Sequence, residues 1–189
     1  MNRFTTFIEQ NISGKKVFVL FILTNLVYVF MLAVTIPKTM EFSNKMKLLD
    51  MMPMGYDFNY VSKLFNTLEK NGREIYLTNQ IPVDMIYPLL FGFSYCLLLG
   101  YFLKKLNKLN TPYSYLCILP IIAGVCDYLE NFGIIIMLNN YPDLTKILVS
   151  STNIFTILKS VSTSLFFVTL IIILIILGLA SLDKKSRKV

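Results

Sequence analysis

Four apolar stretches constrain this chain most, because each is long enough to cross the hydrocarbon core of a bilayer. A helix needs about 20 predominantly apolar residues for that crossing. Backbone polar groups in lipid must be satisfied internally, and none of the stretches alternates like a barrel strand, so we expect helices. The predicted spans are Val17–Ile36, Val83–Leu103, Tyr113–Leu138 and Ser160–Ala180.

The composition is that of a membrane protein built as one domain. Hydrophobic residues make up 55% of the 189 positions, and a mean hydropathy of +0.62 exceeds that of soluble domains of this length. No internal repeat or low-complexity linker divides residues 1–189, so we predict a single transmembrane domain. The predicted fold class is all-α: a polytopic bundle of four transmembrane helices.

The positions of the basic residues are more informative than the net charge of +7. Three short segments, residues 1–16, 104–108 and 181–189, hold ten of the 18 basic residues. Positive residues concentrate on the cytoplasmic side of membrane proteins. We therefore predict a multi-pass protein of the cell membrane with both termini and the second loop in the cytoplasm. Because these charges flank spans, the expected partners are membrane lipids and not nucleic acid.

The first extracytoplasmic loop, residues 37–82, is too long to be a simple connector. Apolar residues recur at three- and four-residue steps over Phe58–Leu68, which predicts an amphipathic helix. Asp57 is a suitable N-cap for that helix, and Asn71-Gly72 is a suitable stop. We expect the helix to lie on the membrane or to cap the bundle.

Acidic residues inside the predicted spans are the main candidates for function. Asp127 and Glu130 lie in the outer half of the third span, and Asp84 lies at the outer start of the second. An Asp at the centre of a membrane helix costs roughly 2.5–3.5 kcal/mol, so such residues face the protein interior and often mark functional sites. Asn131 shares the helix face of Asp127 and Glu130. The alternative is that these carboxyls only hold helices together.

A short second loop makes the second and third spans antiparallel neighbours. Asp84 and Tyr87 should then lie beside the carboxyls of the third span, in one cavity that opens outward, with Arg73 and Tyr76 above it. Like charges one turn apart do not both ionise cheaply, so one carboxyl should hold a proton near pH 7 unless Arg73 or Lys159 is close. An acid beside a carboxylate suits acid–base chemistry.

These positions define the predicted site. The candidate catalytic pair is Asp127 and Glu130, and the candidate ligand-binding residues are Asp84, Tyr87, Asn131, Arg73 and Tyr76. A further wall is expected from the fourth span, from Lys159, Ser160, Thr163 and Ser164. The chain has no histidine, which excludes His-ligated zinc or haem, and we predict neither a metal site nor a cofactor.

Three local patterns accompany these residues: GRxxYL from Gly72, DxxYP from Asp84 and DYxEN from Asp127. With four spans and a long first outer loop, they resemble a family of small bacterial four-span integral membrane proteins of uncharacterised function. The resemblance covers most of the chain. It implies the four-span topology and a shared role for the three patterns, and it carries no known activity.

Three functions fit these features. The first is binding, with or without chemical transformation, of a lipid or small amphiphile in an outward-facing intramembrane carboxylate pocket. The second is a proton- or cation-coupled transporter, which with four spans and no repeat would act as an oligomer. The third is a structural or accessory membrane subunit. The inner halves of the spans are almost purely aliphatic, which favours a closed pocket over a path through the membrane. The sequence leaves catalysis and the oligomeric state open.

The predicted topology is tested by cysteine labelling in intact cells. A cysteine introduced by Asn107→Cys should react with a membrane-impermeant thiol reagent only after the membrane is opened, because the second loop is predicted to be cytoplasmic. Labelling of Asn107→Cys from outside would reverse the orientation.

Overall fold

The computed structural model describes residues 3–186, and all regular structure within that range is helical. Arg187 and Lys188, two of the basic residues behind the predicted topology, lie outside it. Four helical segments are long and apolar enough to cross a membrane: Gly14–Met40, Phe58–Lys105, Pro112–Asn140 and Lys146–Leu182. Each contains one predicted span and extends beyond its predicted bounds.

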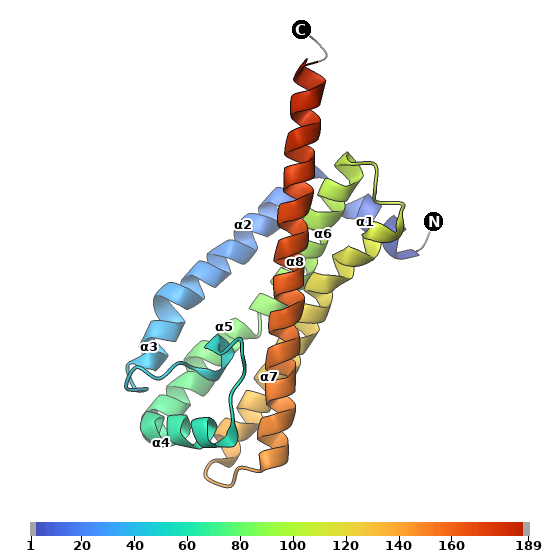
Figure 1. Ribbon diagram of the computed structural model, residues 1–189. Helices are drawn as coiled ribbons and strands as arrows, with labels where there is room; N and C mark the ends of the chain where they lie inside the picture. Colours follow the sequence, from blue (N-terminus) through green and yellow to red (C-terminus); the bar gives the residue numbers. More distant parts are fainter. Residues whose placement is uncertain (1–2, 187–189) are drawn as a thin grey trace.

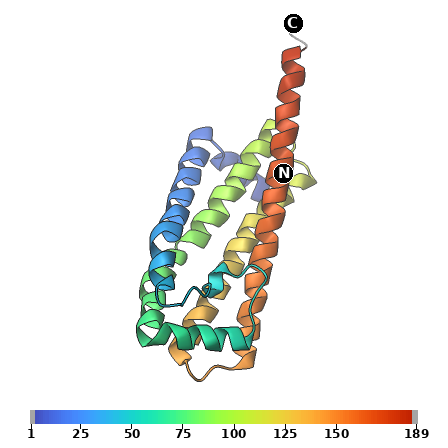
Figure 2. The same ribbon diagram turned by 60° about the vertical axis from the view of Figure 1, so that its left-hand side comes forward.

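The long helices run along a common axis, with both termini toward the same end of the molecule (Figure 1). α2 (Gly14–Phe30) packs on α6 (Tyr87–Lys105), α6 packs on α7 (Leu119–Asn140), and α7 packs on α8 (Lys146–Ser186). Viewed from the side, α2 and α8 therefore form the two flanks, with α6 and α7 between them (Figure 2).

Shorter helices close the two ends of this bundle. At the end that carries the termini, α1 (Arg3–Asn11) packs on α6 and fully buries Ile8, and the third long segment begins with a 3-10 helix, η4 (Pro112–Ile118). At the opposite end lies α4 (Phe58–Ile75), joined to α2 through η1 (Met31–Thr35), α3 (Ile36–Met40) and a loop that includes η2 (Leu49–Met51).

The predicted amphipathic helix is confirmed as the first part of α4, and it caps the bundle. The Asp57 carboxylate caps it by accepting a hydrogen bond from the Tyr60 backbone N–H, at 2.7 Å. Its apolar stripe is buried: Val61, Leu64, Phe65 and Leu68.

The predicted stop of this helix at Asn71-Gly72 is wrong. Helical hydrogen bonding continues to Ile75, and the break comes earlier, at Glu69, whose φ of 52° and ψ of −167° are not helical. Gly72 serves packing instead of termination, because a Cβ placed there would lie 2.6 Å from the Phe42 Cβ. The second predicted span thus begins inside a longer helical segment.

Two wider helical turns each precede a proline. η1 and η3 (Tyr76–Gln80) are π-helical, and each is followed by an Ile-Pro pair, which opens α3 and α5 (Ile81–Asp84) respectively. Proline cannot donate the usual helical hydrogen bond, and a wider turn is one way to accommodate that loss. The Thr35 hydroxyl donates to Gln80 Oε1, so the two irregular turns are fastened to each other.

A third proline connects the second long segment to α7. Pro88 near the start of α6 has no N–H to donate to the Asp84 carbonyl four residues earlier. The Asn131 side-chain amide of α7 donates to that carbonyl instead, at 3.2 Å. The break between α5 and α6 is therefore satisfied across the interface, and it holds Asp84 against α7.

Glycines set the closest helix contacts. A Cβ at Gly124 of α7 would lie 2.7 Å from the Pro88 carbonyl oxygen, so α6 and α7 approach each other closely there. A Cβ at Gly133 would lie 2.1 Å from Thr152 Oγ1 of α8. These positions fix how tightly the three helices pack.

The flanking helices leave their apolar residues uncovered. Most residues in the apolar part of α8, and in that of the segment containing α2, remain exposed in the described structure. In water such surfaces would be strongly unfavourable, whereas in a bilayer they contact lipid at no cost.

Replacing Gly133 tests the packing of α7 against α8. Gly133→Ala should lower the free energy of unfolding by about 1–3 kcal/mol, because the added methyl overlaps Thr152. Gly178→Ala, on the same α8, is the control: nothing lies within 4 Å of its Cβ position, so the change should be under about 1 kcal/mol. Unfolding in mixed micelles measures both, and equal effects would contradict this packing.

Candidate functional site

An ionic cluster of three side chains lies where α7 meets α8. Lys159 Nζ of α8 lies 3.2 Å from Asp127 Oδ1 and contacts Glu130 Oε2. The Lys159, Asp127 and Glu130 side chains are 17%, 9% and 0% exposed, so water solvates them little. Burying a charge costs several kcal/mol unless a partner compensates for it. The single ammonium between two carboxyls provides that compensation.

Glu130 has a second partner, which ties the α2–α4 connection to α8. The Thr156 hydroxyl donates to Glu130 Oε1 at 2.9 Å and lies 3.3 Å from the Tyr56 hydroxyl. Burial raises the pKa of the Tyr56 phenol well above its usual range, so it stays neutral. The Tyr56 backbone N–H also donates to Asn153 Oδ1 at 2.8 Å. Two contacts therefore hold this part of the connection on α8.

A second network holds Asp50 of the same connection against η3. The Tyr76 hydroxyl donates to one Asp50 carboxylate oxygen at 2.8 Å, and the Gln80 amide donates to the other at 2.9 Å. Both Tyr76 and Gln80 are fully buried. Gln80 also accepts a hydrogen bond from Thr35. The network therefore joins the two π-helical turns, η1 and η3, to Asp50 in the loop between α3 and α4.

Asp84 differs from the other acidic residues of this region. Its side chain is buried with 3% exposure, and its Oδ2 has no hydrogen-bond partner among the described residues. The Asn131 contact reaches its backbone carbonyl and not its carboxylate. The Asp84 carboxyl is therefore shielded from bulk water, and its hydrogen bonding is incomplete within the described part of the chain.

A cavity of about 790 Å³ brings these residues together and is lined by residues of α2, α6, α7 and α8. Figure 2 shows the order of these helices, with α6 and α7 between α2 and α8. At the end nearer α4, its charged lining residues are Asp50, Asp84, Asp127 and Lys159, and Met51 and Pro53 lie beside them. Toward the other end the walls are largely aromatic, with Phe21, Tyr28, Tyr87, Phe91, Tyr95 and Phe167.

The cavity is elongated and opens sideways. Its lining runs along α8 from Lys159 to Leu170, which is roughly 16 Å at the helical rise per residue. Three of its lining residues on the flanking helices remain exposed: Tyr28 at 42%, Leu32 at 46% and Phe167 at 40%. The mouth therefore lies between α2 and α8, on the apolar flank of the bundle.

The predicted site residues are only partly brought together in this cavity. Asp84, Tyr87 and Asp127 line it, and so does the predicted wall of Lys159, Ser160, Thr163 and Ser164. Glu130 and Asn131 are buried on the predicted face of α7, behind the lining. Tyr76 does not line the cavity, but its hydroxyl donates a hydrogen bond to Asp50, which does.

Arg73, which was predicted to lie above the carboxyls, does not line the cavity. Its guanidinium donates to the Phe65 carbonyl at 2.7 Å and lies 4.5 Å from the centre of the Tyr141 ring. These contacts hold the kinked part of α4 against the end of α7. The cation beside the carboxyls is Lys159, the other one that the sequence offered.

Several functional candidates were missed at the sequence level. Asp50 and Gln80 lie in the long first loop, where a polar residue carries no signal. Asn25 and Tyr28 of α2 face the cavity, and only the low polarity of their surroundings could have drawn attention to Asn25. Thr156 lies on the polar side of α8, which is mostly apolar. A threonine there is equally typical of packing between two helices, so the sequence did not mark it as a site residue.

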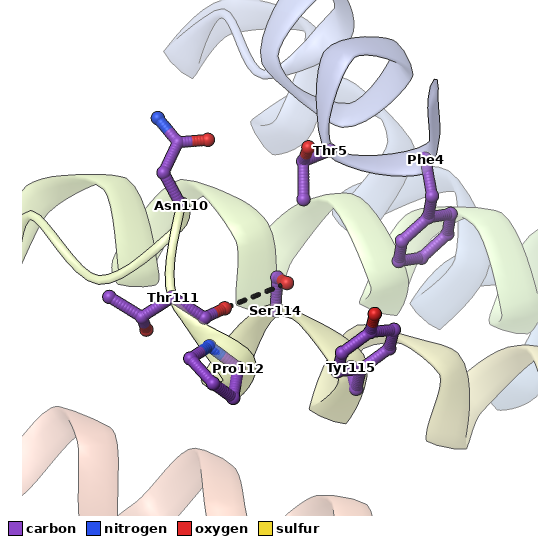
Figure 3. Close-up of a pocket in the computed structure, with 7 residues that line it drawn as sticks. All are labelled: Phe4, Thr5, Asn110, Thr111, Pro112, Ser114 and Tyr115. Carbon is purple, nitrogen blue, oxygen red and sulfur yellow. Dashed lines mark hydrogen bonds between the residues drawn. The ribbon is translucent and has the colours of Figure 1, made fainter. Parts of the chain in front are cut away.

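A second cavity, of about 500 Å³, lies at the end that carries the termini (Figure 3). Phe4 and Thr5 of α1 face the segment from Asn110 to Tyr115 across it, and the Ser114 hydroxyl donates to the Thr111 carbonyl at 2.9 Å. None of its described lining residues is an acid, a lysine or an arginine. The cavity between α2 and α8 is therefore the better candidate for a functional site.

No protein-family model, curated protein or solved structure matches this chain. The resemblance to small bacterial four-span membrane proteins therefore stays a prediction.

Removing the Lys159 ammonium tests the ionic cluster. Lys159→Met should lower the free energy of unfolding by about 3–5 kcal/mol, because two buried carboxyls lose their cation. Adding Asp127→Asn and Glu130→Gln should recover most of the loss. Lys104→Met is the control, since the Lys104–Glu9 pair is 51% and 32% exposed and should contribute less than about 1 kcal/mol. Similar losses for both lysine variants would contradict the role of Lys159.

Proposed function

We propose that this protein is a multi-pass membrane protein that binds a lipid or small amphiphile in the cavity between α2 and α8. One observation carries the proposal: a single elongated cavity has ionisable groups at one end, aromatic walls at the other and a mouth on the apolar flank. Sites for small molecules combine apolar walls with a few convergent polar groups in this way. In a membrane, a ligand could enter from the lipid without crossing water.

The proposed orientation places the charged end of the cavity in the outer half of the membrane. The described parts of the basic segments predicted to be cytoplasmic lie at one end of the bundle, and α4 lies at the opposite end. Asp50, Asp84 and Lys159 are nearer α4. The head of an amphiphile would then lie near the outer surface, with its chain along the aromatic walls toward the membrane centre.

The residues of this site would have different tasks. Asp84 and Asp127 reach the cavity and would contact the head of the ligand. Glu130 lies behind them and acts through Lys159, which it helps to hold in place. Asn131 positions Asp84 through the backbone carbonyl. Of the candidate catalytic pair, only Asp127 lines the space in which a ligand would lie.

The packing at the other end of the cavity favours a blind pocket over a transport path. Ring centres of Phe91 and Tyr95 are 4.7 Å apart, and that of Phe166 on α8 is 5.2 Å from Tyr95. These side chains belong to an apolar cluster at the end that carries the termini, together with residues of α1. A transport path would need polar groups through this cluster.

Blocking the mouth tests ligand binding. The protein would be placed in phosphatidylcholine nanodiscs with a panel of single-chain amphiphiles that carry a photoreactive group in the chain and cationic, neutral or anionic heads. At least one should label peptides of α6 and α8 saturably. Ser164→Trp should weaken that binding about tenfold or more, roughly 1.4 kcal/mol, because the indole fills the mouth.

Leu165→Trp is the matched control for this block. Leu165 is the next residue on α8, is 52% exposed and does not line the cavity. Its variant should bind like the unmodified protein. Absence of saturable labelling by every member of the panel, or equal loss in both Trp variants, would contradict the proposed function.

A further inference from the structure

Carboxyl groups outnumber basic groups at the charged end of the cavity. Four carboxyls lie there or directly behind it, those of Asp50, Asp84, Asp127 and Glu130. Lys159 is the only lysine or arginine among the described lining residues. Its ammonium is already shared between two carboxyls of α7, so it does not offset the others.

Asp84 is the carboxyl whose partners are incomplete. Asp127 and Glu130 share Lys159, and Asp50 accepts from Tyr76 and Gln80. Asp84 lines the same cavity at 3% exposure, and its Oδ2 has no partner among the described residues. A buried carboxyl with incomplete hydrogen bonding is unfavourable, so Asp84 favours a ligand that brings a donor, and most of all a positively charged one.

Aromatic rings extend the same preference along the cavity. Tyr87 lines the cavity three residues after Asp84, and its ring stacks with Tyr28 of α2 at 5.5 Å between centres. The faces of aromatic rings attract cations, more strongly where water is excluded. The Asp84 carboxyl and the rings of Tyr87 and Tyr28 therefore all favour a positive charge on a ligand, although they lie on different helices.

We infer that the cavity selects amphiphiles with an ammonium head, and that Asp84 is the residue that recognises the head. This inference rests on the proposed function and adds the chemical class of its ligand. The ammonium N–H groups would donate to the Asp84 carboxyl, near the ring of Tyr87, while the chain lies along the aromatic walls. An anionic head would add a negative charge beside carboxyls that already exceed the available cations, and binding would be weakened.

The test compares heads on one chain. Three photoreactive single-chain amphiphiles, with a primary ammonium, a hydroxyl and a sulfate head, would be titrated into phosphatidylcholine nanodiscs that carry the unmodified protein. Saturable labelling of α6 and α8 peptides would report binding. We expect the affinity of the ammonium probe to be at least about tenfold higher than that of the hydroxyl probe, a difference that corresponds to one charge-assisted hydrogen bond. The sulfate probe should have the lowest affinity of the three.

A variant pair assigns the selectivity to Asp84. Asp84→Asn should remove most of the preference for ammonium, measured as the ratio of the dissociation constants of the hydroxyl and ammonium probes. Glu74→Gln is the matched control, because Glu74 is an exposed carboxyl outside the cavity, and it should keep the preference. Ethylamine, a soluble amine with the same head, should compete only at far higher concentration, because it lacks the chain.

The outcomes separate this inference from the proposed function. Saturable labelling that is equal for the three heads would overturn the selectivity and leave amphiphile binding standing. Competition by ethylamine as strong as by the amphiphile would overturn the assignment to an amphiphile. An unchanged preference in Asp84→Asn would overturn the role of Asp84. The unmodified protein alone answers the question of head selectivity, so the inference remains testable if that variant fails to fold.

Discussion

The pairing of Lys159 with Asp127 and Glu130 is the interaction on which the arrangement of α7, α8 and the cavity depends. Lys159 carries a positive charge on α8, which holds the most apolar stretch of the four long helical segments. An ammonium without a partner in such a helix would cost a large free energy inside a membrane. Meeting both carboxyls fixes the rotation and the height of α8 on α7. The same geometry turns Lys159, Ser160 and Ser164 toward the cavity and leaves the aliphatic residues of α8 to the outside. The cluster thus provides both a helix contact and one wall of the site.

Prolines shape the other side of the site. Pro37, Pro82 and Pro88 each remove a helical hydrogen bond, and the structure replaces the lost order with specific polar contacts. Thr35 and Gln80 join the two π-helical turns, and Gln80 goes on to hold Asp50. The carbonyl that Pro88 leaves free is bonded by Asn131. Irregular backbone inside a membrane protein is tolerated where protein groups satisfy it, and here those groups are the ones that position Asp50 and Asp84.

Periodicity and burial energetics made much of this predictable from sequence. The helical character of the spans, the capping helix after Asp57 and the inward face of Asp127, Glu130 and Asn131 follow from local patterns. Long-range pairing does not follow from local patterns. Which cation meets the carboxyls depends on how α4 and α8 pack, and the sequence offered both Arg73, as a predicted site residue, and Lys159, in a further wall. The contribution of Asp50 depends on the path of a long loop. The expected stop at Gly72 failed because a glycine at a close helix contact and a glycine at a helix end look alike in sequence.

The central claim is that the space between α2 and α8 is a ligand site that opens to the membrane. An electron cryo-microscopy structure of the protein in a lipid nanodisc tests this claim most directly. We expect elongated density between the two helices, with its polar end beside Asp84 and its chain along Tyr87 and Phe91. A structure in which α2 closes onto α8, so that side chains fill this space and Asp84 gains a protein partner, would contradict it.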